Sequence, residues 1–321
     1  MHIYADSLDD LLRAVFEALL EKGEKVVPSK GPNRELFGVV VELNKPLARI
    51  SRTETKGRLY SALGELFWYL SGSNELAFID YYLKGGYKSD PDDGKTVWGA
   101  YGPRLFNVRD GINQIAQVRK LLAAKPASRK AVVQLFNAED ISQKHADVPC
   151  TCTLQFLIRQ SGLDMFVTMR SNDAYKGLPH DIFAFTMLQE LLARDLGVPL
   201  GRYKHAAGSL HLYETDEAKA RAFLEEGWQD IIEMPPMPLG DQWSAIEALK
   251  SVEEKIRTGV EVDIGALGLD TYWADIARAL KIFALTKKGA RAANRDQVEA
   301  VSKAMSSDYF RPYIGDRKKK L

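Results

Sequence analysis

The stretch from residue 131 to residue 213 constrains the fold more than any other part of this 321-residue sequence. Three apolar runs of strand length follow one another there, and they read AVVQLF, CTLQFLIR and LDMFVTMR. The next apolar stretch, DIFAFTMLQELLARDLG, predicts a long buried helix that ends at Gly197, and GSLHLY predicts one more strand. Because strands and helices are mixed without a regular βαβ alternation, the pattern indicates an α+β fold.

The flanking segments predict further helices. Apolar residues recur at helical spacing from Leu8 to Leu19, and again over residues 57–71, where Glu65 lies among them. A strand, LFGVVVEL, is predicted between these two helices, a polar loop over 83–97 and another helix over 111–124. After Asp216 the sequence is almost wholly helical. We therefore expect a domain over residues 1–216 and a helical extension over residues 217–321 that packs on it.

Composition excludes several classes of protein. Lys and Arg number 44 against 43 Asp and Glu, a net charge of +1 that argues against a nucleic-acid partner. Two cysteines exclude a disulfide scaffold and are typical of a reducing compartment. We see no signal peptide and no uncharged apolar run of roughly eighteen residues, so we expect a cytoplasmic protein without a membrane partner.

Standard cofactor motifs are missing. The sequence has no GxxxxGK[ST], no GxGxxG after a strand, no HExxH and no GxSxG. None of its five histidines lies at a Cys/His spacing that predicts zinc. We therefore expect no metal.

Cys150 is the candidate nucleophile. It follows Pro149 at the edge of a predicted strand. Cys152 points the same way on a strand, so nothing local separates the two, and a free cysteine is commonly only a small buried hydrophobe. Cys150 is favoured by three cations at strand ends, Arg129, Lys130 and Arg170. Cations that converge on one site can bind an anion, most simply a phosphate.

Several motifs together resemble the thymidylate synthase superfamily. They are Pro-Cys before a strand with Gln155, Arg-Ser-x-Asp, Gly-Leu-Pro, Gly-x-x-His-x-Tyr, SRK at 128–130 and GELFWYLSG at 64–72. In order and spacing the likeness covers roughly residues 5–216. It implies a catalytic domain there, with a thymidylate-synthase-like mixed sheet and packed helices, and leaves 217–321 as an extension.

Asp181 departs from the thymidylate synthase pattern, which has asparagine there to read the uracil edge. Cytosine offers an acceptor at N3 and an amino donor at C4, the reverse of uracil, and a carboxyl group that shares its proton with N3 satisfies both atoms. The chain therefore looks similar to deoxycytidylate and cytidylate 5-hydroxymethylases of the phage type. The alternative is that Asp181 only caps a helix, since it precedes the apolar run IFAF.

The resemblance implies a mechanism. The thiolate of Cys150 adds to C6 of the pyrimidine, Asp181 holds the proton at N3, and C5 attacks the one-carbon unit of 5,10-methylenetetrahydrofolate. Hydroxymethylases then add water, whereas thymidylate synthases transfer hydride from the folate. Glu65 matches the glutamate that orders water, with a helix-edge carboxylate as the alternative. Tyr101 matches a tyrosine near the base, although an ordinary core tyrosine explains it nearly as well.

The same resemblance implies how the nucleotide binds. Arg170 and Ser171 hold the phosphate, with Lys30 in place of a further arginine, and Asp173 and Gly177 meet the base. Two residues, His211 and Tyr213, bond the sugar 3′-hydroxyl. In the family, the pair at Arg129 and Lys130 comes from the partner subunit, which implies a homodimer with shared active sites.

Some alternatives stay open. The chain has Thr151 where thymidylate synthases usually have histidine, and Met169 where they usually have glutamine. Ser171 favours dCMP as substrate and leaves CMP possible. The competing hypotheses are methylation of a pyrimidine monophosphate and a non-catalytic nucleotide-binding homologue.

Overall fold

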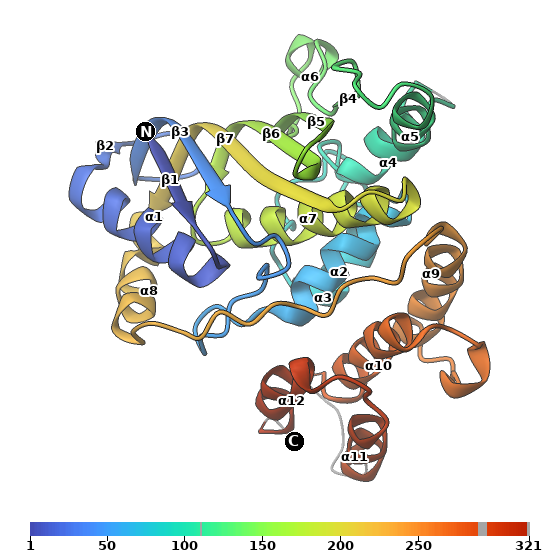
Figure 1. Cartoon of the computed structure of the whole chain (residues 1–321). Coiled ribbons are helices and arrows are strands. Elements are labelled where there is room, and N and C mark those ends of the chain that lie inside the picture. Colours follow the sequence, from blue (N-terminus) through green and yellow to red (C-terminus); the bar gives the residue numbers. More distant parts are fainter. Residues whose placement is uncertain (110, 288–293, 320–321) are drawn as a thin grey trace.

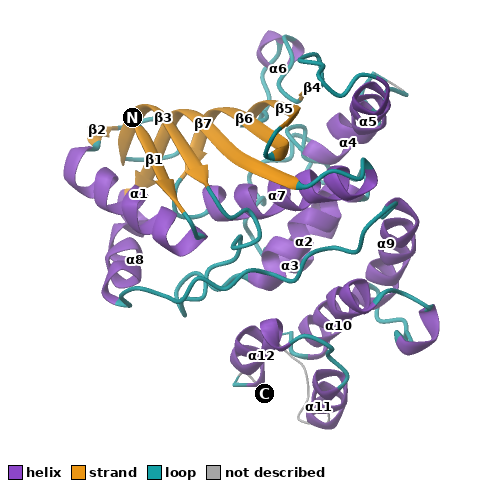
Figure 2. Ribbon diagram, in the orientation of Figure 1, coloured by secondary structure: helices purple, strands orange, loops and turns teal. Residues whose placement is uncertain are grey.

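A seven-stranded mixed sheet forms the body of the molecule (Figures 1 and 2). The computed structural model describes residues 1–109, 111–287 and 294–319. The strands are β1 (His2–Ala5), β2 (Glu24–Val26), β3 (Asn33–Leu43), β4 (Val132–Gln134), β5 (Thr151–Arg159), β6 (Gly162–Asp173) and β7 (Leu200–Tyr213). Their order is β1-β3-β7-β6-β5-β4, with β2 paired to β3. The β1–β3 and β6–β7 pairs are parallel and the others antiparallel.

Helices cover one side of this sheet, where Figure 1 shows α1 and α7 beneath the strands. The α-helices are α1 (Leu8–Lys22), α2 (Leu59–Leu70), α3 (Leu76–Tyr82), α4 (Tyr101–Phe106), α5 (Gln114–Ala124), α6 (Glu139–Ser142), α7 (Gly177–Asp195), α8 (Glu214–Glu225), α9 (Trp243–Arg257), α10 (Thr271–Leu285), α11 (Arg295–Lys303) and α12 (Arg311–Lys318). The predicted α+β fold is confirmed. In the described part of the chain, none of these helices combines the length and the apolar character that crossing a bilayer requires.

The helix α7 is deeply buried, and fifteen of its nineteen residues are shielded from solvent. It packs on β6 and β7 from one side and on α2 from the other. Gly197 follows its end with φ +67°, a left-handed conformation that glycine adopts without strain. The helix begins at Gly177, so Asp181 is its fifth residue and not its N-cap. The capping role considered for Asp181 is therefore wrong.

The sequence missed the short strands β1 and β2. Each has at most four residues, and each owes its existence to pairing with β3. Such short segments carry too few alternating residues to be recognised alone.

The C-terminal helices pack on one another and on the main body. Helices α9 and α10 contact each other, and both contact α2. Tyr82 of α3 and Glu253 of α9 share a buried hydrogen bond of 2.8 Å. Helix α8 instead packs on α1, where Phe16 and Phe223 meet edge to face. Residues 288–293 and 320–321 of the predicted extension lie outside the described residues, and the boundary at 216 stays a prediction.

Candidate functional site

Most of the predicted site residues gather where β6 and β7 end and α7 begins. The parallel register places Ser171 beside Ser209 and Asp173 beside His211. The rings of His211 and Tyr213 lie 5.0 Å apart, edge to face. One carboxylate oxygen of Asp173 accepts hydrogen bonds from the backbone N–H groups of residues 175 and 176, at 2.8 and 3.0 Å. These bonds shape the turn that leads into α7.

Cys150 immediately precedes β5, and Arg170 anchors it. The guanidinium donates to the carbonyl oxygens of Pro149 (2.9 Å) and Val148 (3.0 Å), and Nη2 lies 3.6 Å from Sγ of Cys150. This contact distinguishes Cys150 from Cys152. Burial raises the pKa of the Cys150 thiol to about 11, although the Arg170 charge acts in the opposite direction. The thiol is therefore protonated near neutral pH.

Two acidic residues, Asp90 and Asp147, pair with Lys30 next to the segment that precedes Cys150. The Lys30 ammonium lies 3.7 Å from a carboxylate oxygen of Asp90 and 3.5 Å from one of Asp147. Asp90 belongs to the polar loop 83–97, which these contacts draw against the segment before Cys150. A Cβ on Gly99 would lie 2.4 Å from the Asp147 carboxylate and 3.2 Å from the nitrogen of Pro149. Only glycine lets the two segments cross so closely.

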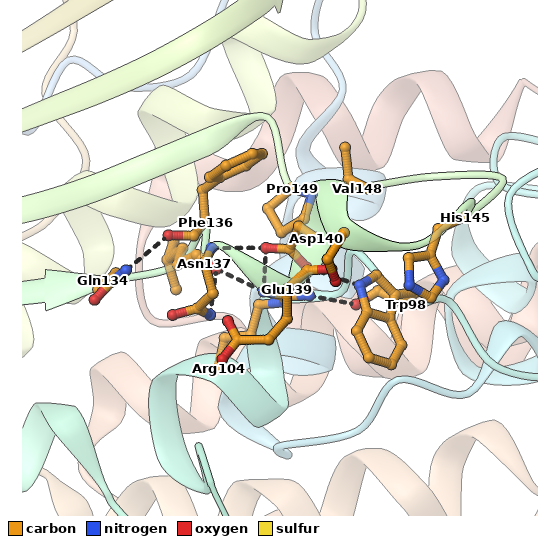
Figure 3. A network of polar contacts seen from close by, with 12 residues as sticks. Trp98, Arg104, Gln134, Phe136, Asn137, Glu139, Asp140, His145, Val148 and Pro149 are labelled. Carbon is orange, nitrogen blue, oxygen red and sulfur yellow. Dashed lines mark hydrogen bonds and ion pairs between the residues drawn. The ribbon is translucent and has the colours of Figure 1, made fainter.

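A polar network lies close to the segment before Cys150 (Figure 3). Asp140 accepts two hydrogen bonds from Arg104, at 2.6 and 2.9 Å, and one from the Trp98 indole at 2.7 Å. His145 stacks on Trp98 with ring centroids 4.1 Å apart. Burial pushes the pKa of Asp140 up, but these bonds and one from the backbone of Asn137 outweigh it and hold that pKa below its usual value. Sequence analysis did not identify this network.

Asp181 is buried in the same region with an amide beside it. The side-chain amide of Asn172 donates to Oδ2 of Asp181 at 2.6 Å, and both side chains are almost completely shielded from solvent. A Cβ on Gly177 would stand 3.5 Å from the same Oδ2. Burial, and then the charge of Glu65, raise the pKa of Asp181 well above its usual value. The carboxyl group is thus favoured in its protonated form.

Tyr101 lies close to both Cys150 and Asp181. Its hydroxyl oxygen accepts hydrogen bonds from the backbone N–H of Thr151 (3.1 Å) and from the Thr151 hydroxyl (2.9 Å). Burial, followed by the charges of Asp181 and Cys150, raises the pKa of Tyr101 well above the usual value. The threonine that replaces the family's usual histidine therefore bonds directly to this tyrosine.

Glu65 lies on α2, close enough to Asp181 for its charge to act on that carboxyl group, and two phenols hold it. Tyr69 donates to Oε1 at 2.6 Å and Tyr87 donates to the same oxygen at 2.8 Å. The sequence analysis missed both tyrosines. Tyr69 lies four residues after Glu65 on one helix, a spacing that brings side chains together, so a signal for it existed. Tyr87 comes from the loop 83–97, which carried no such signal.

Arg129 and Lys130 do not reach Cys150 within one chain. Both side chains are exposed, and the Arg129 carbonyl accepts a hydrogen bond from the side chain of Gln155. Gln155 lies five residues beyond Cys150, about 16 Å along an extended strand. Among the described residues of one chain, no hydrogen bond or ion pair joins the side chain of Arg129 or Lys130 to Cys150 or Arg170, so their convergence on one site stays a prediction. No group of three or more His, Cys, Asp or Glu side chains suited to a metal ion occurs among the described residues.

Comparison with known proteins identifies the family. The sequence model described as Thymidylate synthase matches residues 16–255, more than half of the chain. The chain belongs to the thymidylate synthase family. The match extends beyond residue 216 into α9, so it includes part of the predicted extension. The predicted relationship and fold are confirmed.

One relative within this family is the deoxyuridylate hydroxymethyltransferase of Bacillus phage SP01. It is 30% identical to this chain over 218 residues, which cover 63% of this chain and 56% of the relative. The chain thus spans a little over half the length of that curated relative. This relative of the chain is named for hydroxymethyl transfer.

Proposed function

We propose that this protein transfers a one-carbon unit from 5,10-methylenetetrahydrofolate to C5 of a cytidine monophosphate nucleotide and adds water, which gives the 5-hydroxymethyl product. Family membership supports one-carbon transfer to a pyrimidine nucleotide, and the phage relative supports the hydroxymethyl outcome. Between the deoxyribose and ribose nucleotides, dCMP is favoured over CMP, because Ser171 matches the residue pattern of deoxycytidylate hydroxymethylases.

The hydrogen bond from Asn172 to Asp181 carries the choice of cytosine. Because the amide donates to Oδ2, that oxygen is an acceptor, and the proton of a neutral carboxyl group resides on Oδ1. The group then offers one donor and one acceptor, which matches N3 and the amino group of cytosine. The proposal therefore requires Oδ1 to face N3 and Oδ2 to face the C4 substituent. In that orientation the N3–H of uracil would meet a donor and its O4 an acceptor, which would leave polar groups unpaired in a buried site.

The catalytic steps follow from these positions. The Cys150 sulfur adds to C6, and its proton must leave because the buried thiol is protonated in the free enzyme. Asp181 keeps a proton at N3, which draws electrons from C6. C5 then bonds to the methylene carbon of the folate, and loss of the C5 proton with expulsion of tetrahydrofolate leaves an exocyclic methylene at C5. Tyr101, next to both groups, is suited to assist removal of the C5 proton.

Binding of the nucleotide uses the remaining residues. Arg170 and Ser171 bind the phosphate with Lys30 nearby, Asp173 and Gly177 meet the base, and His211 and Tyr213 bond the sugar. Arg129 and Lys130 reach the phosphate of the partner subunit's site in a homodimer. Their exposure, and their distance from Cys150 within one chain, support that arrangement.

A second candidate is the same reaction on deoxyuridylate, favoured by the name of the phage relative. The two candidates differ only at the base edge that Asp181 meets. The same experiment therefore separates them.

The test measures turnover of dCMP, CMP and dUMP with methylenetetrahydrofolate, and the mass of each product. We expect hydroxymethyl products from cytidine nucleotides and the poorest turnover from dUMP. The Asp181→Asn variant should lose at least about 100-fold in kcat/KM for dCMP relative to dUMP, since a carboxamide pairs with uracil. The Cys150→Ser variant serves as the inactive control. Efficient dUMP turnover by the unaltered protein would refute the cytidine assignment, and a methyl product would refute water addition.

A further inference from the structure

Glu65 is held by one oxygen only. The phenols of Tyr69 and Tyr87 both donate to Oε1, and among the described residues no hydrogen bond reaches Oε2. The carboxylate is 5% exposed, so its orientation is set by these partners and not by bulk water. When one carboxylate oxygen accepts two hydrogen bonds and the other accepts none, the second oxygen is the one oriented to accept a proton.

We propose that Tyr69 and Tyr87 are positioning residues that hold Glu65 so that Oε2 takes the proton of the water that becomes the hydroxyl group of the product. This inference rests on the proposed function, because it concerns the step in which water adds. It names two residues of the water-adding machinery in addition to Glu65 itself.

The step balances as follows. The intermediate carries an exocyclic methylene at C5 and the Cys150 sulfur at C6. The water oxygen bonds to the methylene carbon, the π electrons of that double bond move onto the ring, and Oε2 of Glu65 takes the water proton. The ring electrons then re-form the C5–C6 double bond as the C6–S bond breaks, and the sulfur leaves as a thiolate that regains a proton.

The two tyrosines hold Glu65 from two different elements. Tyr69 lies one helical turn after Glu65 on α2, so it is rigidly placed. Tyr87 comes from the loop 83–97 and packs edge to face on Trp68 at 5.3 Å. Asp92 in that loop bonds His145 at 2.7 Å, and Asp90 pairs with Lys30. The loop that carries Tyr87 is thus tied to the segment before Cys150.

Both phenols remain donors over the whole working pH range. Burial, followed by the charge of Glu65, raises the pKa of Tyr69 and of Tyr87 well above the usual value. The other titratable groups next to Glu65 are His180 and Asp181 on α7. They stay unchanged in tyrosine variants, so a difference between variants reports the phenols.

The experiment compares Tyr69→Phe, Tyr87→Phe and the double variant with Tyr82→Phe. Tyr82 is the matched control, because it is a buried tyrosine whose hydroxyl donates to a different carboxylate, that of Glu253 on α9. Turnover of dCMP is followed in the presence of 2-mercaptoethanol, whose thiol competes with water for the methylene. The ratio of thioether to hydroxymethyl product reports the water step, and nucleotide affinity reports the integrity of the site.

We expect each single variant to raise the thioether-to-hydroxymethyl ratio by about tenfold, consistent with loss of one hydrogen bond to a charged group. Nucleotide affinity should stay within about twofold of the unaltered protein, and Tyr82→Phe should not change the ratio.

Two results would each overturn this role. If both tyrosine variants match Tyr82→Phe in the thioether-to-hydroxymethyl ratio, the positioning role is overturned while the proposed function stands. The positioning role also fails if the loss of turnover in these variants comes entirely from weaker nucleotide binding. Failure of the unaltered protein to form hydroxymethyl product from any nucleotide would instead overturn the proposed function.

Discussion

At the scale of single residues, Cys150 shows how burial competes with charge. Its neighbours Arg170 and Lys30 lower the pKa of the thiol, yet desolvation dominates and raises it to about 11. In the free protein the cations beside Cys150 therefore do not outweigh its burial. The sulfur becomes reactive only when a bound nucleotide changes its surroundings or a base takes its proton.

This protonation state predicts slow alkylation. The rate at which iodoacetamide modifies Cys150 in the free protein should be low at neutral pH and rise about tenfold per pH unit toward pH 11. Peptide mass spectrometry separates this site from Cys152, and Arg170→Ala should slow the reaction further at a fixed pH, because a cation is lost. A rate that is already maximal below pH 9 would contradict the burial argument.

At the scale of elements, α7 organises the packing around the site. Its buried Glu190 pairs with Arg49 and also accepts a hydrogen bond from the backbone N–H of Met237 at 2.7 Å. One carboxylate therefore joins α7 to the segment before α2 and to the linker between α8 and α9. The same helix carries Asp181, so the position of the base-reading group depends on this anchor.

Loss of the Arg49–Glu190 ion pair should lower the stability of the fold. We expect Arg49→Met to lower the free energy of unfolding by about 3 kcal/mol, because the Glu190 carboxylate loses its fully buried partner and keeps only Arg194, 3.4 Å away, and the Met237 N–H. The double variant Arg49→Met, Glu190→Met should recover much of this loss. Urea unfolding of the three proteins measures both effects. If the single and double variants are equally destabilised, the loss comes from packing and not from an unpaired charge.

At the scale of the whole molecule, the sheet presents a face that no helix covers among the described residues shown in Figure 1. Along β6, Met165 and Val167 are buried, whereas Phe166, Thr168 and Arg170 stay partly or fully exposed. Of these three side chains Phe166 is apolar and half-buried, and the uncovered face is available for the proposed homodimer.

Shared active sites predict complementation between inactive variants. Cys150→Ser and the double variant Arg129→Ala, Lys130→Ala should each be nearly inactive alone. After unfolding and refolding as a mixture, they should regain about a quarter of full activity, because half of the dimers are mixed and each mixed dimer has one intact site. Refolding each variant by itself is the control. Absence of recovery in a mixture shown to contain mixed dimers would place the two basic residues with Cys150 of their own chain.

Sequence alone determined what depends on local pattern. The helix predicted over 57–71 is α2 at Leu59–Leu70, and the helix predicted over 111–124 is α5 at Gln114–Ala124. Hydrophobic periodicity determined these elements because each buries its own apolar face. Spaced motifs identified the family for a different reason: the chemistry at one site requires given residue types in a given order along the chain.

Only the tertiary structure decided what depends on distant partners. The amide of Asn172 beside Asp181, the phenol of Tyr87 on Glu65 and the protonated state of Cys150 all arise from contacts between separate elements. Burial and hydrogen-bond partners set these properties, and neither is readable from neighbouring residues in the chain. Pairing with β3 likewise creates β1 and β2, because a short strand is stable only against a neighbour.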